Sequence, residues 1–196
     1  MLATTDIDIR AALHAKKLQH YRASPDAIVV DELGLAHAKV RVDIAVINGC
    51  VHGYEIKSSL DTLDRLPAQL DVYKQSLGKL TIVCAPKHTD RVQKLAPDWC
   101  GILEAEKGTR GAVAFASVRR GRYNPEINAE HLAHLLWRPE AMALLAQHGA
   151  SPRLLRQSRK LLYRHLAELM TINQLTEAIR NFMQARRVWR DLPTRA

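Results

Sequence analysis

Two carboxylates and a lysine are the residues whose spacing could do chemistry. Asp43 lies in the segment Lys39–Ile47, and Glu55 and Lys57 lie in the segment Val51–Lys57. Apolar residues occupy every second position of the first segment, which predicts a strand with one aliphatic, buried face. An Asn-Gly pair stands between the two segments and predicts a β-hairpin. Asp43 therefore lies on the face that is not aliphatic.

The length of the hairpin loop decides which side chains face one another. A strict two-residue turn would set Asp43 opposite Tyr54. An odd-length loop, or a bulge at Gly53, would set Asp43 opposite Glu55, and this odd register is our prediction. Carboxylates about 5 Å apart across a strand pair repel one another unless a cation lies between them. Their oxygen atoms suit Mg²⁺ or Mn²⁺, and a nearby lysine can hold an attacking water.

These residues resemble a known motif. Asp43, eleven intervening residues and then Glu55-Ile56-Lys57 resemble the core of the PD-(D/E)xK nuclease superfamily, and Gln69 and Tyr73 resemble the QxxxY motif of its RecB-like branch. The resemblance covers roughly residues 27–84. It implies an α/β (α+β) fold, with a restriction-endonuclease-like mixed β-sheet flanked by helices, followed here by an all-α C-terminal appendage.

The resemblance also implies roles for particular residues. The implied catalytic residues are Asp43, Glu55 and Lys57. The implied ligands of Mg²⁺ or Mn²⁺ are Glu32, Asp43, Glu55 and the carbonyl of Ile56. The substrate-binding candidates are Gln69, Tyr73, Arg65, Arg119 and Arg120. Glu32 could equally be a solvated acid at a strand end, Gln69 and Tyr73 could lie at the edge of a core helix, and the two later arginines could belong to a linker.

Composition limits the class of protein. The chain has 196 residues, of which 47% are hydrophobic. This length fits one domain with a small appendage, and we predict a nuclease-like core over 1–120 and a basic helical region over 121–196. No apolar run is long enough for a membrane helix. Three scattered cysteines indicate reduced thiols in a cytoplasmic protein.

Positive charge is concentrated near the C-terminus. The net charge of the chain is +9, and from Pro152 onward ten basic residues stand against three acids, which gives this tail +7. Such a segment favours a polyanionic partner, here DNA, although a solvated helical face would have the same composition.

The periodicity predicts alternating elements. We expect helices over 7–20, 62–76 (or beginning near Pro67) and 89–95, and several helices after Asn128. We expect strands beginning at 27 and over 80–84, 99–104 and 112–118. Ser151-Pro152 predicts the start of a helix that continues to Leu169, and Thr171 to Gln174 has the capping-box pattern that opens a last helix.

The leading functional prediction is a Mg²⁺- or Mn²⁺-dependent deoxyribonuclease that acts in DNA repair, recombination or phage or defence DNA processing, and that could form a homodimer. A second hypothesis is a non-cleaving nucleic-acid-binding module of a larger complex on the same fold. A third is that the hairpin carboxylates only form an ion-pair network on the strand face, with Arg41 and Lys57 as its cations.

Overall fold

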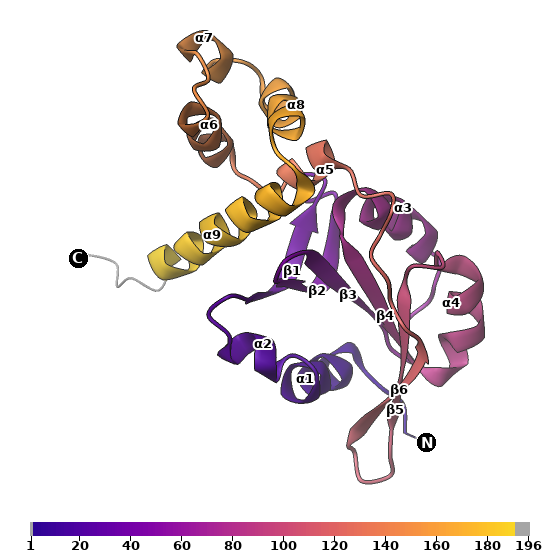
Figure 1. The fold of residues 1–196 in the computed structure, drawn as a ribbon. Helices are drawn as coiled ribbons and strands as arrows, with labels where there is room; N and C mark the ends of the chain where they lie inside the picture. Colours follow the sequence, from indigo (N-terminus) through magenta and orange to yellow (C-terminus); the bar gives the residue numbers. More distant parts are fainter. Residues whose placement is uncertain (1, 191–196) are drawn as a thin grey trace.

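One mixed β-sheet organises the described part of the chain. The structure, a computed structural model, describes residues 2–190, with side chains as far as Arg186. The six strands lie in chain order, with β3–β4 and β4–β5 parallel and the other neighbours antiparallel (Figure 1). They are β1 (Ile28–Leu35), β2 (Val40–Ile47), β3 (Val51–Lys57), β4 (Lys79–Cys84), β5 (Gly101–Lys107) and β6 (Val113–Arg119).

Helices flank the sheet and form the C-terminal region, so the predicted mixed α/β class is confirmed. Before and within the sheet lie α1 (Asp6–Lys16), α2 (Gln19–Ala23), α3 (Leu66–Ser76), the short 3₁₀ helix η1 (Pro86–His88) and α4 (Thr89–Leu95). After the sheet come α5 (Ala129–Ala133), α6 (Arg138–Gln147), α7 (Pro152–Leu155), α8 (Arg159–Leu169) and α9 (Ile172–Arg190). The tail residues Asp191 and Arg195, and the side chains of Arg187 and Arg190, lie outside the described part.

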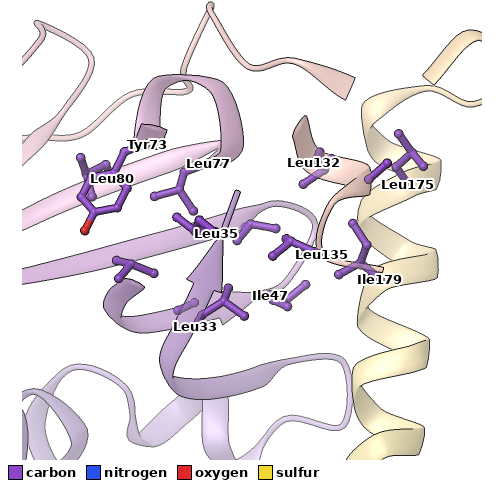
Figure 2. Close-up of a cluster of buried hydrophobic side chains, with 14 of the residues drawn as sticks. Leu33, Leu35, Ile47, Tyr73, Leu77, Leu80, Leu132, Leu135, Leu175 and Ile179 are labelled. Atoms are coloured by element: carbon purple, nitrogen blue, oxygen red, sulfur yellow. The ribbon is translucent and has the colours of Figure 1, made fainter. Parts of the chain in front are cut away.

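Apolar side chains fill a core on each face of the sheet. The larger one, the α3-side core, joins sheet residues such as Leu35 and Leu80 to Tyr73 of α3, Leu132 of α5 and Ile179 of α9 (Figure 2). The α1-side core joins Ile9 and Leu13 of α1 to sheet residues on the other face. The C-terminal helices thus share a core with the sheet, while the division at residues 120 and 121 stays a prediction.

The second half of strand β2, residues 44–47, is buried on both faces, so the expectation of one aliphatic face is wrong. Ala45 and Ile47 belong to the α3-side core, whereas Ile44 and Val46 belong to the α1-side core. The reason is that helices cover both faces, which favours a continuous apolar segment over alternation.

The regular alternation of side chains between the two faces of the sheet is interrupted at one point of β1 and β2, which we call the phase change. Val42 and Ile44 are two residues apart, yet they belong to opposite cores. Across from them, Glu32 has a left-handed backbone conformation with φ +56. The residue pairs between β1 and β2 run from Asp31–Ile44 to Leu33–Val42 and skip Glu32 and Asp43. Glu32 and Asp43, which lie across from one another, are therefore not part of the regular strand pairing at this phase change.

Several predicted boundaries need correction. Helix α3 begins at Leu66, so the start near Pro67 is confirmed and the start at residue 62 is wrong, because proline suits the first turn of a helix. The predicted helix from Ser151 to Leu169 is two helices, because Ser158 caps α8 by accepting a hydrogen bond from the Leu161 N–H. Between residues 2 and 190, no helix has the length and apolar character that a membrane span needs.

Candidate functional site

The predicted odd register of the hairpin is confirmed. Strands β2 and β3 are joined by residues 48–50, an odd-length loop, and Ile44 pairs with Tyr54. Gly49 has φ +67, a conformation that glycine adopts without strain. Because the register is antiparallel, Asp43 and Glu55 follow as the next opposed positions. The sequence thus correctly predicted the register that sets Asp43 opposite Glu55.

Glu55 is a buried carboxylate held by three side chains. Its exposed fraction is 2%, and Lys57 Nζ lies 2.7 Å from its Oε1. From α3, Gln69 Nε2 donates to the same oxygen at 2.8 Å, and Tyr73 Oη donates to Oε2 at 2.5 Å. Gln69 Oε1 also accepts from Lys57 Nζ at 3.0 Å. A buried charge needs such partners, so the sequence Gln-x-x-x-Tyr acts here by positioning Glu55 and Lys57.

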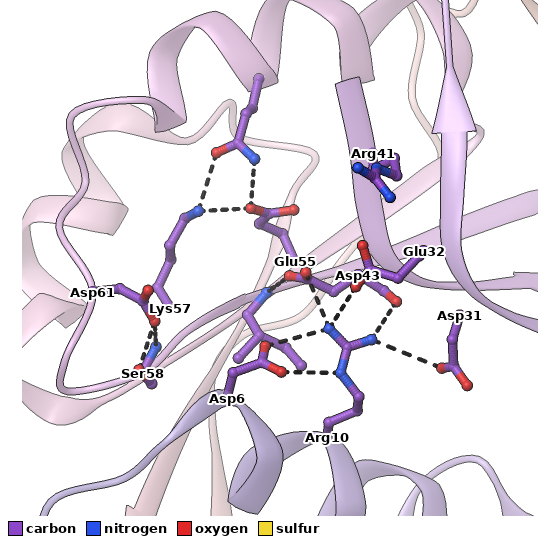
Figure 3. Close-up of polar contacts among 12 residues, drawn as sticks. Asp6, Arg10, Asp31, Glu32, Arg41, Asp43, Glu55, Lys57, Ser58 and Asp61 are labelled. Atoms are coloured by element: carbon purple, nitrogen blue, oxygen red, sulfur yellow. Dashed lines mark hydrogen bonds and ion pairs between the residues drawn. The ribbon is translucent and has the colours of Figure 1, made fainter. Parts of the chain in front are cut away.

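Asp43 is held by a backbone amide and by an arginine that the sequence analysis missed. Its Oδ2 accepts from the Ile56 N–H at 2.6 Å, and Arg10 Nη2 lies 3.3 Å from its Oδ1. Arg10 Nη1 also donates to the Asp43 carbonyl at 2.7 Å. The same guanidinium binds Glu32 at 2.8 Å and Asp6 at 3.0 Å, as Figure 3 shows. Helix α1 thus places the Arg10 guanidinium beside Glu32 and Asp43, the two acids at the phase change of β1 and β2.

All four carboxylate oxygens of Asp43 and Glu55 have a donor within the protein. The ion-pair network of the third hypothesis is therefore present, with one correction. Its cations are Arg10 and Lys57, whereas Arg41 is exposed and its side chain makes no ion pair among the described residues. Arg41 lies on the solvent side of β2, because the phase change turns that part of the strand toward solvent.

The pKa of the Asp43 carboxyl is raised to about 7. Burial is the largest cause, since it disfavours the charged form, and the nearby Glu55 carboxylate is the next. The Ile56 N–H and Arg10 act in the opposite direction and favour the ionised form. The acid thus stands near the balance between its two protonation states at neutral pH.

The carboxylates line a cavity of about 690 Å³, which we call the acid cavity. Its lining has equal numbers of acidic and basic side chains, five of each. The acids are Asp6, Glu32, Asp43, Glu55 and Asp61, and the bases are Arg10, Lys39, Arg41, Lys57 and Arg65. Lys39, Arg41 and Arg65 are exposed, and their side chains have no hydrogen-bond or ion-pair partner in the described part of the chain. The rim of the cavity is therefore positive.

The remaining predicted substrate-binding residues separate into two groups. Arg65 and Gln69 line the acid cavity, whereas Tyr73 is fully buried beneath it and cannot contact a substrate from solvent. Arg119 and Arg120 are not among the lining residues. Arg119 instead donates to the backbone carbonyls of Cys100 and Pro97, so its guanidinium fastens β6 to the loop before β5.

A Mg²⁺ or Mn²⁺ site here stays a prediction. The described residues contain no group of three or more His, Cys, Asp or Glu side chains arranged to hold a metal ion. The oxygen donors of Glu32 and Asp43 suit a hard cation, but Arg10 Nη2 lies within 3.3 Å of both. A divalent ion bridging these two acids would have to displace this guanidinium.

Comparison with known proteins decides the family. The model of the bacteriophage P4 protein cII family matches residues 5–191. The chain belongs to this family. Protein cII of Enterobacteria phage P4 is 36% identical over 124 residues, which is 63% of this chain and 47% of that protein, so the chain matches about half the length of this relative.

One solved structure also overlaps with the chain. The SPO1766 protein of unknown function from Silicibacter pomeroyi is 16% identical, with a TM-score of 0.41 over 98% of this chain and 100% of that one. At this TM-score the overlap supports no statement about fold or function.

The family membership corrects the leading functional prediction. The prediction of a metal-dependent DNA nuclease is wrong, because the relationship found is with the phage P4 cII family and brings no nuclease activity with it. The resemblance of the hairpin motif to PD-(D/E)xK proteins, and the restriction-endonuclease-like form of the sheet, stay predictions.

Replacing Tyr73 with Phe should destabilise the fold. It removes the hydroxyl that donates to Glu55 Oε2 at 2.5 Å and leaves a buried carboxylate oxygen without that partner. The expected loss in the free energy of unfolding is about 1–3 kcal/mol, measured by urea denaturation. Tyr123→Phe is the control, because the Tyr123 side chain is 45% exposed. Equal losses in the two variants would contradict the role given to Tyr73.

Asp43 should make stability depend on pH. Its pKa is about 7 in the folded protein against 3.8 ordinarily, so between these values the folded form binds more protons. Stability from this group is present at low pH and falls as pH rises toward about 7, by at most about 1.4 kcal/mol per pH unit. The free energy of unfolding of wild type and of Asp43→Asn can be measured by urea denaturation near pH 5 and near pH 8. Relative to Asp43→Asn, wild type should be less stable at the higher pH than at the lower pH. A pH-independent difference would contradict the raised pKa.

Arg10→Gln tests whether a divalent ion can use these acids. The variant should lose about 2 kcal/mol of unfolding free energy, because Asp43 and Glu32 lose their shared cation. We expect Mg²⁺ or Mn²⁺ to raise the melting temperature of Arg10→Gln more than that of wild type. Arg91→Gln is the control, since Arg91 is 64% exposed and reaches Asp64 only at 3.9 Å. If divalent ions leave Arg10→Gln unchanged, these acids form no metal site.

Proposed function

We propose that this chain is a nucleic-acid-binding protein that acts on DNA in the cytoplasm without cleaving it. The observation that carries the proposal is the exposed run of cations, Lys39, Arg41 and Arg65, on the rim of the acid cavity. Cations without protein partners are free to bind phosphates and release the counterions around them. The overall charge of +9 favours the same kind of partner.

The positive surface continues beyond the acid cavity. A second cavity, lined by Arg138, Arg159 and Arg186, adjoins the first across the turn between β1 and β2, because Ala38 lines both. A phosphate backbone that follows the rim would therefore pass from Arg65 and Arg41 over this turn to Arg159. Membership of a bacteriophage family is consistent with a DNA partner.

The state of the carboxylates supports binding without cleavage. Lys57 is held between Glu55 and Gln69, and Arg10 is held between Asp43 and Glu32. These cations neutralise acids that would otherwise repel a phosphate backbone. The carboxylates thus act as anchors for the strands and for α1, while the outer cations meet the DNA.

The test is DNA binding by wild type, Arg41→Ala/Arg65→Ala and Arg110→Ala. Arg110 is also an exposed arginine, lies in the turn between β5 and β6, and is not among the residues that line the acid cavity. We expect the double variant to bind labelled duplex or single-stranded DNA about tenfold more weakly, and its salt slope to fall by about two. Arg110→Ala should bind like wild type.

Two results would overturn the proposal. One is equal weakening by Arg41→Ala/Arg65→Ala and Arg110→Ala, which would mean a general charge effect. The other is cutting of the labelled DNA by wild type in Mg²⁺ that is absent in Asp43→Asn, because the protein would then cleave its partner.

A further inference from the structure

The second cavity has the chemistry of an anion site beside aromatic rings. Its volume is about 570 Å³, within the usual range for small-molecule sites. It lies between the β1–β2 turn, the segment 134–137 that follows α5, and helices α6, α8 and α9. We call it the arginine cavity, because Arg138, Arg159 and Arg186 line it and no carboxylate does. Its aromatic lining residues are His37, His134, Trp137 and Tyr163.

One wall of the arginine cavity is a strained turn. Ala36, His37 and Ala38 all have left-handed backbones, with φ values of +48, +61 and +64. A left-handed backbone conformation at a residue other than glycine costs about 1 kcal/mol of folding free energy. Backbone strain of this kind is concentrated at functional sites. The turn places the His37 ring 4.3 Å from the His134 ring and 5.8 Å from the Tyr163 ring, measured between centroids. His37 itself remains exposed, so its ring can also receive a ligand.

Another part of the lining is an exposed tryptophan, Trp137, whose ring is held by an arginine. Trp137 is 56% exposed, although its backbone N–H is held by Glu140 Oε2 at 2.7 Å. The Arg186 guanidinium lies over the indole, 4.1 Å from its centroid, and is itself paired with Glu140. Arg186 covers one face of the ring only. The indole is thus held in place, and its other face is available for a planar ligand to stack on.

Arg159 is the lining cation available for a phosphate. Arg186 is paired with Glu140, and Arg138 donates to the carbonyls of Leu155 and Gln157. The Arg159 side chain is exposed and has no hydrogen-bond or ion-pair partner among residues 2–186. It lies near His37, whose pKa is lowered by partial loss of contact with water and also by the charges of Arg159 and Lys39.

We propose that the arginine cavity binds one nucleotide unit, with its base against Trp137 and His37 and its phosphate on Arg159. A planar ring joined to an anion is the ligand that matches exposed rings beside an unpaired guanidinium. The unit could be an unpaired nucleotide of a bound strand or a free mononucleotide. In its strand form the inference rests on the DNA binding proposed above.

The experiment measures binding to the full chain of four probes: an oligothymidylate about ten nucleotides long, an abasic strand of the same length, AMP and inorganic phosphate. We expect the oligothymidylate to bind about tenfold more tightly than the abasic strand, because the latter has phosphates without bases. Trp137→Ala should remove this advantage, and Trp137→Phe should keep most of it. Tyr123→Ala, which removes an exposed ring elsewhere, should match wild type.

The probes separate the two sources of the nucleotide. Binding of AMP that is lost in Trp137→Ala and Arg159→Ala, and that inorganic phosphate does not reproduce, supports a free mononucleotide. A base-dependent advantage for the strand alone supports an unpaired nucleotide of DNA. Equal binding of the normal and abasic strands, with no AMP binding, overturns the inference.

Failure of the inference is distinguishable from failure of the proposed function. Duplex binding that depends on Arg41 and Arg65 would survive if the arginine cavity takes no base. Conversely, base-dependent binding at Trp137 would survive if the rim of the acid cavity contacts no DNA.

Discussion

The buried carboxylate of Glu55 is the constraint on which the sheet and α3 jointly depend. A carboxyl side chain with 2% exposure is tolerable only where hydrogen-bond donors replace its water. Lys57 is supplied by the same strand, two residues on, and Gln69 and Tyr73 are supplied by one face of α3. These contacts fix the rotation of α3 over β3 more narrowly than apolar packing would, because hydrogen bonds have direction.

The hairpin shows how far the sequence determines this site. The sequence allowed a two-residue turn or an odd-length loop, and the odd register that we predicted is the one that sets Asp43 opposite Glu55. The spacing of Gln69 and Tyr73 on one helical face was equally local, and so was the capping box at Thr171, where Gln174 accepts from the Thr171 N–H at 2.9 Å. Predictions of this kind succeed because they depend on neighbours in the chain.

Arg10 could not be found in the same way. It lies 33 residues from Asp43, and nothing in the pattern of α1 distinguishes it from a solvated arginine. The left-handed backbone at Glu32 and over Ala36 to Ala38 also carried no signal, because these residues are not glycine. Arg119 was misjudged for a related reason. In the sequence, an arginine that binds backbone carbonyls cannot be distinguished from an arginine that binds a phosphate of a ligand.

Charge balance explains how anchoring acids and the proposed DNA-binding surface can share one cavity. The fold places two cations, Arg10 and Lys57, in contact with the carboxylates and leaves Lys39, Arg41 and Arg65 at the rim. Interactions with exposed charges are weakened by water and salt over about 10 Å, so a phosphate at the rim interacts mainly with the nearest cations. The inner acids are paired and contribute little repulsion at that distance. Removing an inner cation would therefore weaken DNA binding and stability together, whereas removing a rim cation would weaken binding alone.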